Sequence, residues 1–308
     1  MTSFAHVTIV GAGAMGCFFA ARLREAGTAI TLVDTDTARL AAIQANGVTL
    51  EDDGGPRTVA VAACPAAQAG PTDLVMLFTK GMHSAAAIKS VAHLAADGTC
   101  AITLQNGLGN AEAMAEVFSR DRILMGVTDW PADFSPPATV SSHGAGRIWL
   151  GAMAAGPAGP VEAALRLFDA AGLPAKRDDH VEVQIWEKVA FNAALNALAA
   201  VTRVRVGGLD CPPGREIAFA ILDEVAATAA ARGLLLDSRR LTSKVEHALA
   251  HHRQHKASML QDIEAGRRTE IEAINGAVIR AAEAHGVPTP VTRTLANLVR
   301  MIEARSPS

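Results

Sequence analysis

The sequence predicts an α/β protein with an N-terminal domain built on a mostly parallel sheet and an all-helical C-terminal domain. Short apolar segments alternate with helical segments up to about residue 178, and a glycine-rich turn joins the first apolar segment to the first helix. After that point only helical segments follow. We therefore expect one domain at 1–178 and a second at 179–308.

Composition narrows the class of protein. The chain has 308 residues, half of them hydrophobic, and a net charge of -3 without any basic block, so nucleic acid is not an expected partner. No signal peptide and no long unbroken apolar segment is evident, so no membrane association is expected. The four cysteines are widely scattered, which suits reduced thiols in a cytoplasmic protein. A largely helical second domain would suit a homodimer.

The first strand, expected at 5–10, leads into a G-x-G-x-x-G turn and then a helix that reaches about residue 26. In this motif the first glycine allows a tight turn, the second lets the backbone approach a pyrophosphate, and the third allows close helix packing. The turn therefore predicts a Rossmann-type dinucleotide site; a glycine-rich turn without a ligand is the alternative. The expected cofactor-binding residues are Gly11, Gly13, Ala14, Met15 and Gly16.

The second strand, expected at 29–33, ends at Asp34. A carboxylate at this position can accept hydrogen bonds from both ribose hydroxyls of NAD and would repel the additional phosphate of NADP. Asp34 therefore favours NAD. Because Thr35, Thr37 and Arg39 could still recruit a phosphate, NADP stays open as the cofactor.

The next elements are a helix at 38–45, which Asp36 or Thr37 could cap, and a hairpin of strands 48–50 and 58–62. We expect this hairpin to be inserted in the sheet domain.

Two apolar strands of the buried parallel kind follow, at 73–79 and 100–104, with a helix at 84–96 between them. They lead into Lys80 and Asn106. Because ligands of open α/β sheets bind outside the carboxyl ends of the strands, both residues should stand beside the pyrophosphate turn. Ordinary turn chemistry is the alternative.

Residues 122–151 are strand-like and rich in proline, which indicates an antiparallel edge. A helix at 159–171 and a short strand at 173–176 complete the first domain. The helices expected in the second domain are 180–202, 213–232, 238–255, 270–285 and 290–303.

The first of these helices carries three polar residues, Lys188, Asn192 and Asn196, on an otherwise apolar surface. Steps of four residues turn only about 40° around a helix, so the three side chains form one stripe. A buried ammonium is costly, yet it can release a proton near neutral pH and so serve as a general acid. A polar seam between helices, or a lysine reaching water, is the alternative.

Further candidates lie later in the chain. His247, His251 and His255 share one helix face but extend over about 12 Å, too far for one ion, so no metal is expected. Thr269 and Glu272 have the spacing of a capping box. Local rules give no structural account of Ser258 and Glu270.

Several motifs stand in order along the chain: residues 11–16, Thr79-Lys80, Gln105-Asn106-Gly107, Trp186-x-Lys188-x-x-x-Asn192-x-x-x-Asn196, and Ser258-Met259-x-Gln261-Asp262 with Arg267-x-Thr269-Glu270-Ile271. Together they resemble the ketopantoate reductase (2-dehydropantoate 2-reductase) family over nearly the whole chain. The last two of these motifs are far more specific than the glycine turn.

The resemblance implies a small-molecule 2-oxo acid substrate, reduced by hydride from NAD(P)H while the lysine at position 188 donates the proton. It implies that Asn192, Asn196 and Ser258 hold the substrate's polar groups and that Glu270 assists near the substrate. Two further residues are implied on the cofactor side: Lys80 for the cofactor, and Asn106 for both substrate and cofactor.

One residue departs from the family pattern. Members that use NADPH commonly carry an arginine just after the second strand, where this chain has Asp34. The expected function is reduction of ketopantoate to pantoate, in pantothenate biosynthesis. An NAD-linked enzyme for another short 2-oxo or 2-hydroxy acid is the alternative, and a dinucleotide-binding protein without turnover is a remote one.

Overall fold

The computed structural model describes residues 3–305, which fall into two compact units. The first unit runs to Gln105 and resumes over Asn110–Val181. The second unit contains Asn106–Gly109 and the chain from Glu182 onward. A four-residue segment is thus part of the second unit although the chain on both sides of it belongs to the first.

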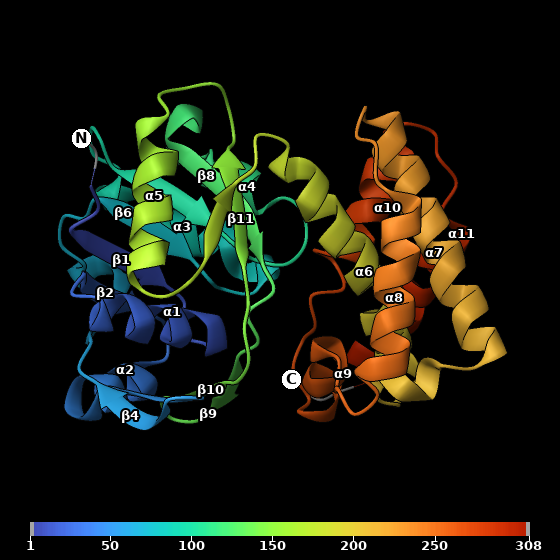
Figure 1. The fold of residues 1–308 in the computed structure, drawn as a ribbon, viewed down its shortest axis with the longest axis horizontal. Coiled ribbons are helices and arrows are strands. Elements are labelled where there is room, and N and C mark those ends of the chain that lie inside the picture. Colours follow the sequence, from blue (N-terminus) through green and yellow to red (C-terminus); the bar gives the residue numbers. More distant parts are fainter. Residues whose placement is uncertain (1–2, 306–308) are drawn as a thin grey trace. The chain divides into compact units, whose positions relative to one another are not determined.

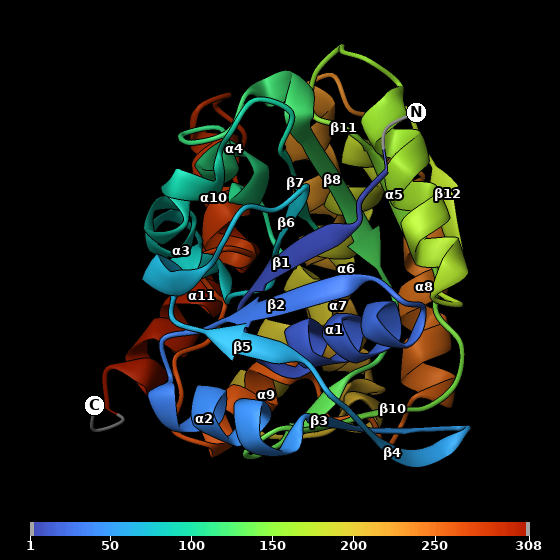
Figure 2. The same cartoon turned by 90° about the vertical axis from the view of Figure 1, so that its left-hand side faces the viewer.

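Within the described residues, the first unit is built on an eight-stranded sheet, which lies between two layers of helices in Figure 2. All pairs of neighbouring strands are parallel except β8 with β11, as expected for an antiparallel edge. This confirms the predicted α/β class. The strand order is β12 (Ala175–Arg177), β11 (Ile148–Ala152), β8 (Ile123–Thr128), β7 (Cys100–Thr103), β6 (Leu74–Leu77), β1 (His6–Val10), β2 (Ala29–Val33) and β5 (Ala62–Cys64).

Five α-helices accompany these strands in the part of the unit that the structure describes. They are α1 (Ala14–Glu25), α2 (Thr37–Asn46), α3 (Ser84–Ser90), α4 (Asn110–Met114) and α5 (Gly159–Ala170). The helix expected at 84–96 is wrong in its length, because it ends at Ser90 and a 3₁₀ turn, Ala92–Leu94, follows. The short helix α4 was not expected.

Alternation along the strands gives the sheet two apolar faces. Val7 and Ile9 belong to the core formed with Phe18 and Phe19 of α1. Val10 belongs to a separate core on which α3 and α4 pack. Figures 1 and 2 show α1 and α5 on one face of the sheet and α3 on the other. Both faces of the parallel sheet are therefore covered, which explains its nearly continuous apolar strands.

The expected hairpin forms within the first unit, as predicted, but its strands are not part of the eight-stranded sheet. Its strands β3 (Val48–Asp52) and β4 (Gly55–Val59) pair antiparallel, and β3 also pairs in parallel with β10 (Thr139–Ser142). With β9 (Asp133–Ser135) they make a separate four-stranded sheet. Pairing β3 with β10 joins segments about 90 residues apart, which local sequence patterns do not reveal.

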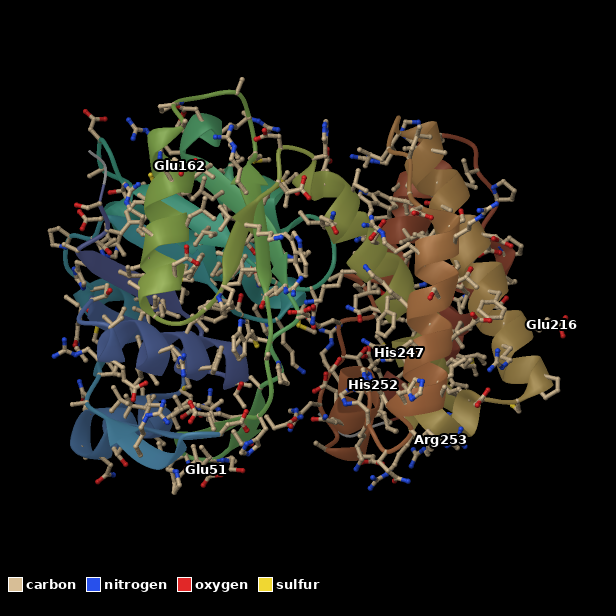
Figure 3. All side chains as sticks on the ribbon, in the orientation of Figure 1. Glu51, Glu162, Glu216, His247, His252 and Arg253 are labelled. Atoms are coloured by element: carbon tan, nitrogen blue, oxygen red, sulfur yellow. The ribbon has the colours of Figure 1, made fainter. Side chains whose placement is uncertain are left out.

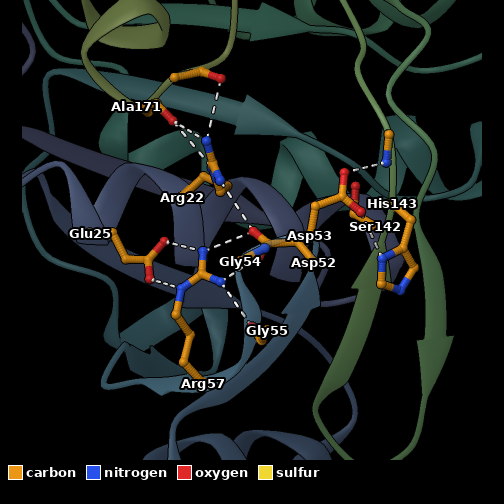
Figure 4. Close-up of polar contacts among 12 residues, drawn as sticks. Arg22, Glu25, Asp52, Asp53, Gly54, Gly55, Arg57, Ser142, His143 and Ala171 are labelled. Atoms are coloured by element: carbon orange, nitrogen blue, oxygen red, sulfur yellow. Dashed lines mark hydrogen bonds and ion pairs between the residues drawn. The ribbon is translucent and has the colours of Figure 1, made fainter.

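An ion-pair network attaches this hairpin to α1 (Figure 4). The Asp52 carboxylate, 11% exposed, accepts hydrogen bonds from Arg22 at 3.2 Å and from Arg57 at 2.8 Å. Arg57 also pairs with Glu25. These contacts lower the pKa of Asp52 to about 2, mainly through the hydrogen bond from Arg57.

Every described element of regular secondary structure in the second unit is a helix. Its α-helices are α6 (Val181–Thr202), α7 (Pro212–Ala231), α8 (Ser238–His251), α9 (Ser258–Glu264), α10 (Asn275–Glu283) and α11 (Pro290–Glu303). Most of α6 is buried in a single core, and residues such as Ala190, Ala193 and Ala194 have no exposed surface. None of the helices among the described residues has the length and apolar character that a membrane span requires.

Two sequence expectations in this unit are wrong. The helix expected at 270–285 begins only at Asn275, so Thr269 and Glu272 do not form a capping box. Instead the Thr269 hydroxyl accepts the N–H of Ile271 at 3.1 Å, and Glu272 pairs with Arg300. The helix expected to reach residue 255 ends at His251. The short helix α9 was not expected.

Candidate active site

The glycine turn between β1 and α1 has the conformation that its sequence predicts. Gly11 has a φ of +107°, and its N–H donates to Val33 O at 2.7 Å, which bonds the turn to the end of β2. A Cβ on Gly11 would lie 2.8 Å from Thr79 N. Only glycine fits here, because the backbone is left-handed and the segment after β6 touches it.

The other two glycines of the turn differ in a way that suits a bound pyrophosphate. A Cβ on Gly16 would lie 1.8 Å from Gly11 O, so this position needs glycine for packing. A Cβ on Gly13 would meet no atom within 4 Å, so the space in front of Gly13 is open. Gly13 directly precedes α1 and provides no side-chain cap, and the first N–H groups of a helix have no partner within the helix. Ala14 and Met15, both half-buried, are the first two residues of α1. The N-terminal end of this helix therefore fits an anionic ligand.

The Asp34 carboxylate lies beside this turn. Its Oδ2 accepts the N–H of Ala12 at 2.6 Å, and its Oδ1 accepts those of Thr35 at 2.8 Å and Asp36 at 3.0 Å. Arg39 Nη1 lies 3.5 Å from Oδ2. Three backbone donors therefore fix the orientation of Asp34, at the strand end where a ribose-binding acid is expected.

Lys80 follows β6, the strand that pairs with β1. Val10, the last residue of β1, is in register with Leu77 of β6, so the chain after Leu77 runs alongside the glycine turn. Lys80 is half-buried and precedes a 3₁₀ turn. The structure thus brings Gly11–Gly16, Asp34 and Lys80 together within the first unit.

The polar stripe of α6 is part of the second unit. Asn192 and Asn196 are 8% and 7% exposed, while Lys188 is half-buried rather than fully buried as the sequence led us to expect. Lys188 lies near the N-terminal end of α6, and the amides lie deeper among alanines. The stripe is therefore most accessible at the lysine.

Asn196 and Ser258 are in direct contact. The Asn196 Nδ2 donates to the Ser258 Oγ at 3.3 Å, although the two residues are 62 positions apart. Ser258 is exposed and is the first residue of α9. This contact joins two of the family-like motifs, and it places a hydroxyl and an amide where both can bind one polar group.

Asn106 and Glu270 belong to neighbouring segments of the same unit. Leu108 N donates to Ala273 O at 2.9 Å, and Gly107, with a φ of +86°, leaves no room for a Cβ against Ala273. Glu270 is half-buried, and its carbonyl accepts the N–H of Ala273 at 3.0 Å. The turn that follows Glu270 therefore holds the segment that carries Asn106.

Two polar residues near the stripe were missed by sequence reasoning. Glu187, 1% exposed, is paired with Arg240 and Lys244 of α8. Asn275, with no exposed surface, donates from Nδ2 to Ala193 O on α6 at 3.2 Å. An acid directly before Lys188 on an apolar helix could have indicated that Glu187 is buried. Its partners could not be predicted in this way, because they lie more than 50 residues away in the sequence.

Histidines at the C-terminal end of α8 and directly after it form a surface cluster, of which Figure 3 labels His247 and His252. The rings of His247 and His251 are 4.5 Å apart and those of His247 and His252 are 5.4 Å apart, centre to centre, and all three residues are exposed. Burial, and then the neighbouring His247, lower the pKa of His252. These positions agree with the expectation of a solvated surface.

A glycine turn of this geometry, with an acid after the second strand of a parallel sheet, defines a dinucleotide-binding α/β protein of the Rossmann class. The helical second unit adds a lysine and amide stripe to that class. Comparison with known proteins then identifies the family. The model described as "Ketopantoate reductase PanE/ApbA" matches residues 7–155, and the model of its C-terminal part matches residues 180–303. The chain belongs to the ketopantoate reductase family.

Individual relatives agree with this assignment. The chain is 31% identical to the 2-dehydropantoate 2-reductase of Halobacterium salinarum, over 97% of this chain and 99% of the relative. It is 33% identical to that of Archaeoglobus fulgidus, over 97% and 98%. The family confirms the expected class of enzyme, an NAD(P)-dependent oxidoreductase.

Solved structures match over the same length. A 2-dehydropantoate 2-reductase from Geobacter metallireducens has a TM-score of 0.90 at 30% identity, covering 96% of this chain and 99% of the other. A D-mandelate dehydrogenase in a ternary structure with NADH and anilino(oxo)acetate has a TM-score of 0.93 at 27% identity, covering 97% and 98%. One fold thus accommodates more than one 2-oxo or 2-hydroxy acid.

Proposed function

We propose that the protein reduces 2-dehydropantoate to pantoate with a nicotinamide cofactor, as a step of pantothenate biosynthesis. The observation that carries this proposal is the contact between Asn196 and Ser258 on the stripe that also bears Lys188. It supplies amide and hydroxyl groups for a polar substrate on the same helix face that bears Lys188. Relatives about 30% identical over nearly the whole chain are 2-dehydropantoate 2-reductases.

In the proposed reaction Lys188 donates a proton to the keto oxygen of the substrate. The reduced nicotinamide, when bound, supplies the hydride. An ammonium stabilises the negative charge that develops on that oxygen, and Asn192, Asn196 and Ser258 bind the other polar groups of the substrate without adding charge. Glu270 assists near the substrate and Lys188.

On the cofactor side, we propose that Gly11, Gly13, Ala14, Met15 and Gly16 bind the pyrophosphate through backbone N–H groups. Asp34 then binds the adenine-side ribose and gives a preference for NAD(H). Lys80 assists with the cofactor, and Asn106 contacts both cofactor and substrate.

A second candidate is an NAD-linked enzyme for another short 2-oxo or 2-hydroxy acid. Two observations favour it: Asp34 follows β2, and a D-mandelate dehydrogenase with NADH is among the most similar solved structures. This candidate keeps Lys188 and the amides in the same roles and changes only the acid that they hold.

Nicotinamide absorbance on the purified protein tests these proposals. NADH and NADPH are each combined with a panel of 2-oxo acids that includes 2-dehydropantoate and phenylglyoxylate. The first proposal expects the highest kcat/KM for 2-dehydropantoate, and another acid at the top of the panel would favour the second. Absence of turnover with every acid and both cofactors would contradict both and leave a binding protein.

We also propose that the protein works in the cytoplasm as a homodimer. Its four cysteines form no disulfide in the structure, which suits a reducing compartment, and Leu298 and Met301 on α11 are apolar side chains exposed at 39% and 53%. Sedimentation equilibrium measures the oligomeric state directly. A monomer at micromolar concentration would contradict the dimer.

A further inference from the structure

Three charged residues at the end of β2 form what we call the acidic corner: Asp34, Asp36 and Arg39. The Arg39 guanidinium is 3.5 Å from Asp34 through Nη1 and 3.3 Å from Asp36 through Nη2. Its Cζ also lies 5.1 Å from the ring centre of Phe134 on β9. The guanidinium is therefore engaged on three sides, and its side chain is only 25% exposed.

The two acids hold Arg39 unequally. Asp34 already accepts three backbone N–H groups, all within 3.0 Å, so its contact with Arg39 is the longest of the four. Asp36 has fewer competing partners. Its Oδ1 accepts the N–H of Arg39 at 3.0 Å and so caps α2, while its Oδ2 faces Arg39 Nη2. One carboxylate oxygen of Asp36 thus caps α2, and the other is available for the ion pair with Arg39.

The charge of the acidic corner matters for a cofactor. Two carboxylates face one guanidinium, so the corner carries net negative charge. An arginine near this strand end is the residue type that accommodates the 2′-phosphate of NADP, because a guanidinium forms strong, paired hydrogen bonds to phosphate oxygens. Here that arginine is present and already paired.

We propose that Asp36 is a second specificity-determining residue, which keeps the protein selective for NAD(H) by occupying Arg39 in an ion pair. This inference rests on the proposed function and extends it beyond Asp34. Asp34 repels a 2′-phosphate directly, whereas Asp36 pairs with Arg39, a neighbouring cation that could bind this phosphate. Phe134 supports this arrangement by fixing the guanidinium over its ring.

Binding of NADH and NADPH, measured by isothermal titration calorimetry without any 2-oxo acid, tests the proposal. Asp36→Asn keeps a side-chain oxygen for the cap of α2 but loses the charge that holds Arg39. We expect the ratio of the NADPH to the NADH dissociation constant to fall by about tenfold, since a hydrogen bond to a charged group is of that order. Circular dichroism checks that the variant is folded.

The double variant Asp36→Asn with Arg39→Gln is the matched control. If Asp36 acts through Arg39, the double variant loses the gain in NADPH affinity. If the double variant keeps the gain, Asp36 acts by simple repulsion and the proposal is overturned.

The remaining outcomes separate this inference from the proposed function. Normal NADH binding with an unchanged ratio in Asp36→Asn overturns the role of Asp36 and leaves the proposed function intact. Failure of both cofactors to bind the unmutated protein overturns both. Normal binding with the expected ratio, but no turnover on any acid, overturns only the proposed reaction.

Discussion

The carboxylate of Glu187 lies 3.2 Å from the ammonium of Lys244, although the Glu187 side chain is only 1% exposed. The other carboxylate oxygen accepts hydrogen bonds from Arg240. Both cations lie on α8, and their side chains are nearly half exposed. The buried member of each ion pair is therefore the Glu187 carboxylate, not the cation. Since Lys188 is the next residue, this pairing fixes the helix turn that carries the proposed proton donor.

Replacing Glu187 by Gln should lower the free energy of unfolding by about 1–3 kcal/mol, because two cations lose the charge that pairs with them. Urea unfolding measures the change. Glu182→Gln is the matched control on the same helix, since its pair with Arg232 is long, at 3.9 Å, and partly exposed. The control should change stability by less than about 0.5 kcal/mol, and an equal loss in both variants would contradict the role given to Glu187.

Removing the ammonium at position 188 should stop the reaction without removing the cofactor. For Lys188→Ala we expect kcat to fall by about 10²–10⁴-fold, the usual contribution of a general acid, with cofactor affinity retained. Lys188→Arg keeps the charge but cannot release a proton, so it should be similarly slow. Steady-state kinetics and calorimetry measure the two quantities, and a rate like that of the unmutated protein in either variant would remove Lys188 from the mechanism.

Two glycines of the turn offer a matched comparison. Gly16→Ala places a methyl group against Gly11 O and should destabilise the protein by about 1–3 kcal/mol. Gly13→Ala meets no protein atom, so stability should hold while affinity for the cofactor falls. Unfolding curves and cofactor titrations on both variants measure this, and unchanged cofactor affinity in Gly13→Ala would argue against pyrophosphate at that position.

The network around Asp52 should make stability depend on pH. Its pKa in the folded protein is about 2, below the ordinary 3.8, so its contribution is fully present above about pH 4 and is lost as the pH falls toward 2. We expect the ionised Asp52 to contribute about 2 kcal/mol to the free energy of unfolding. About half of this contribution should be lost by about pH 3. Unfolding free energies of the unmutated protein and of Asp52→Asn give the difference at each pH. A difference that does not shrink on acidification would contradict this assignment.

Much of the first unit could be predicted because its signals are local. The turn after Val10 needs glycine for backbone reasons, and the alternation along β1 fixes which side chains face each core. The same rules predicted the hairpin of β3 with β4 but not the pairing of β3 with β10, which lies far along the chain. Patterns within one strand show which face is buried but not which strand lies alongside.

The helical unit shows the same limit. The spacing of Lys188, Asn192 and Asn196 predicted their shared face, since one helix sets it. The depth of Lys188 depends on neighbouring helices and was overestimated. The contact of Asn196 with Ser258 joins separate helices, so the sequence could suggest it only through resemblance to a family. Thr269 and Glu272 had the right spacing for a cap, but an Arg300 from another helix binds the acid.

The membership of Asn106–Gly109 in the helical unit means that the polypeptide passes between units three times, at 105/106, 109/110 and 181/182. A single backbone cut near residue 181 would therefore leave Asn106–Gly109 on the N-terminal fragment. Ala273, whose carbonyl accepts the N–H of Leu108, would be on the other fragment. Fragments made at that point should be recovered better by co-expression than apart, because the N-terminal fragment carries Asn106–Gly109, which belong to the second unit.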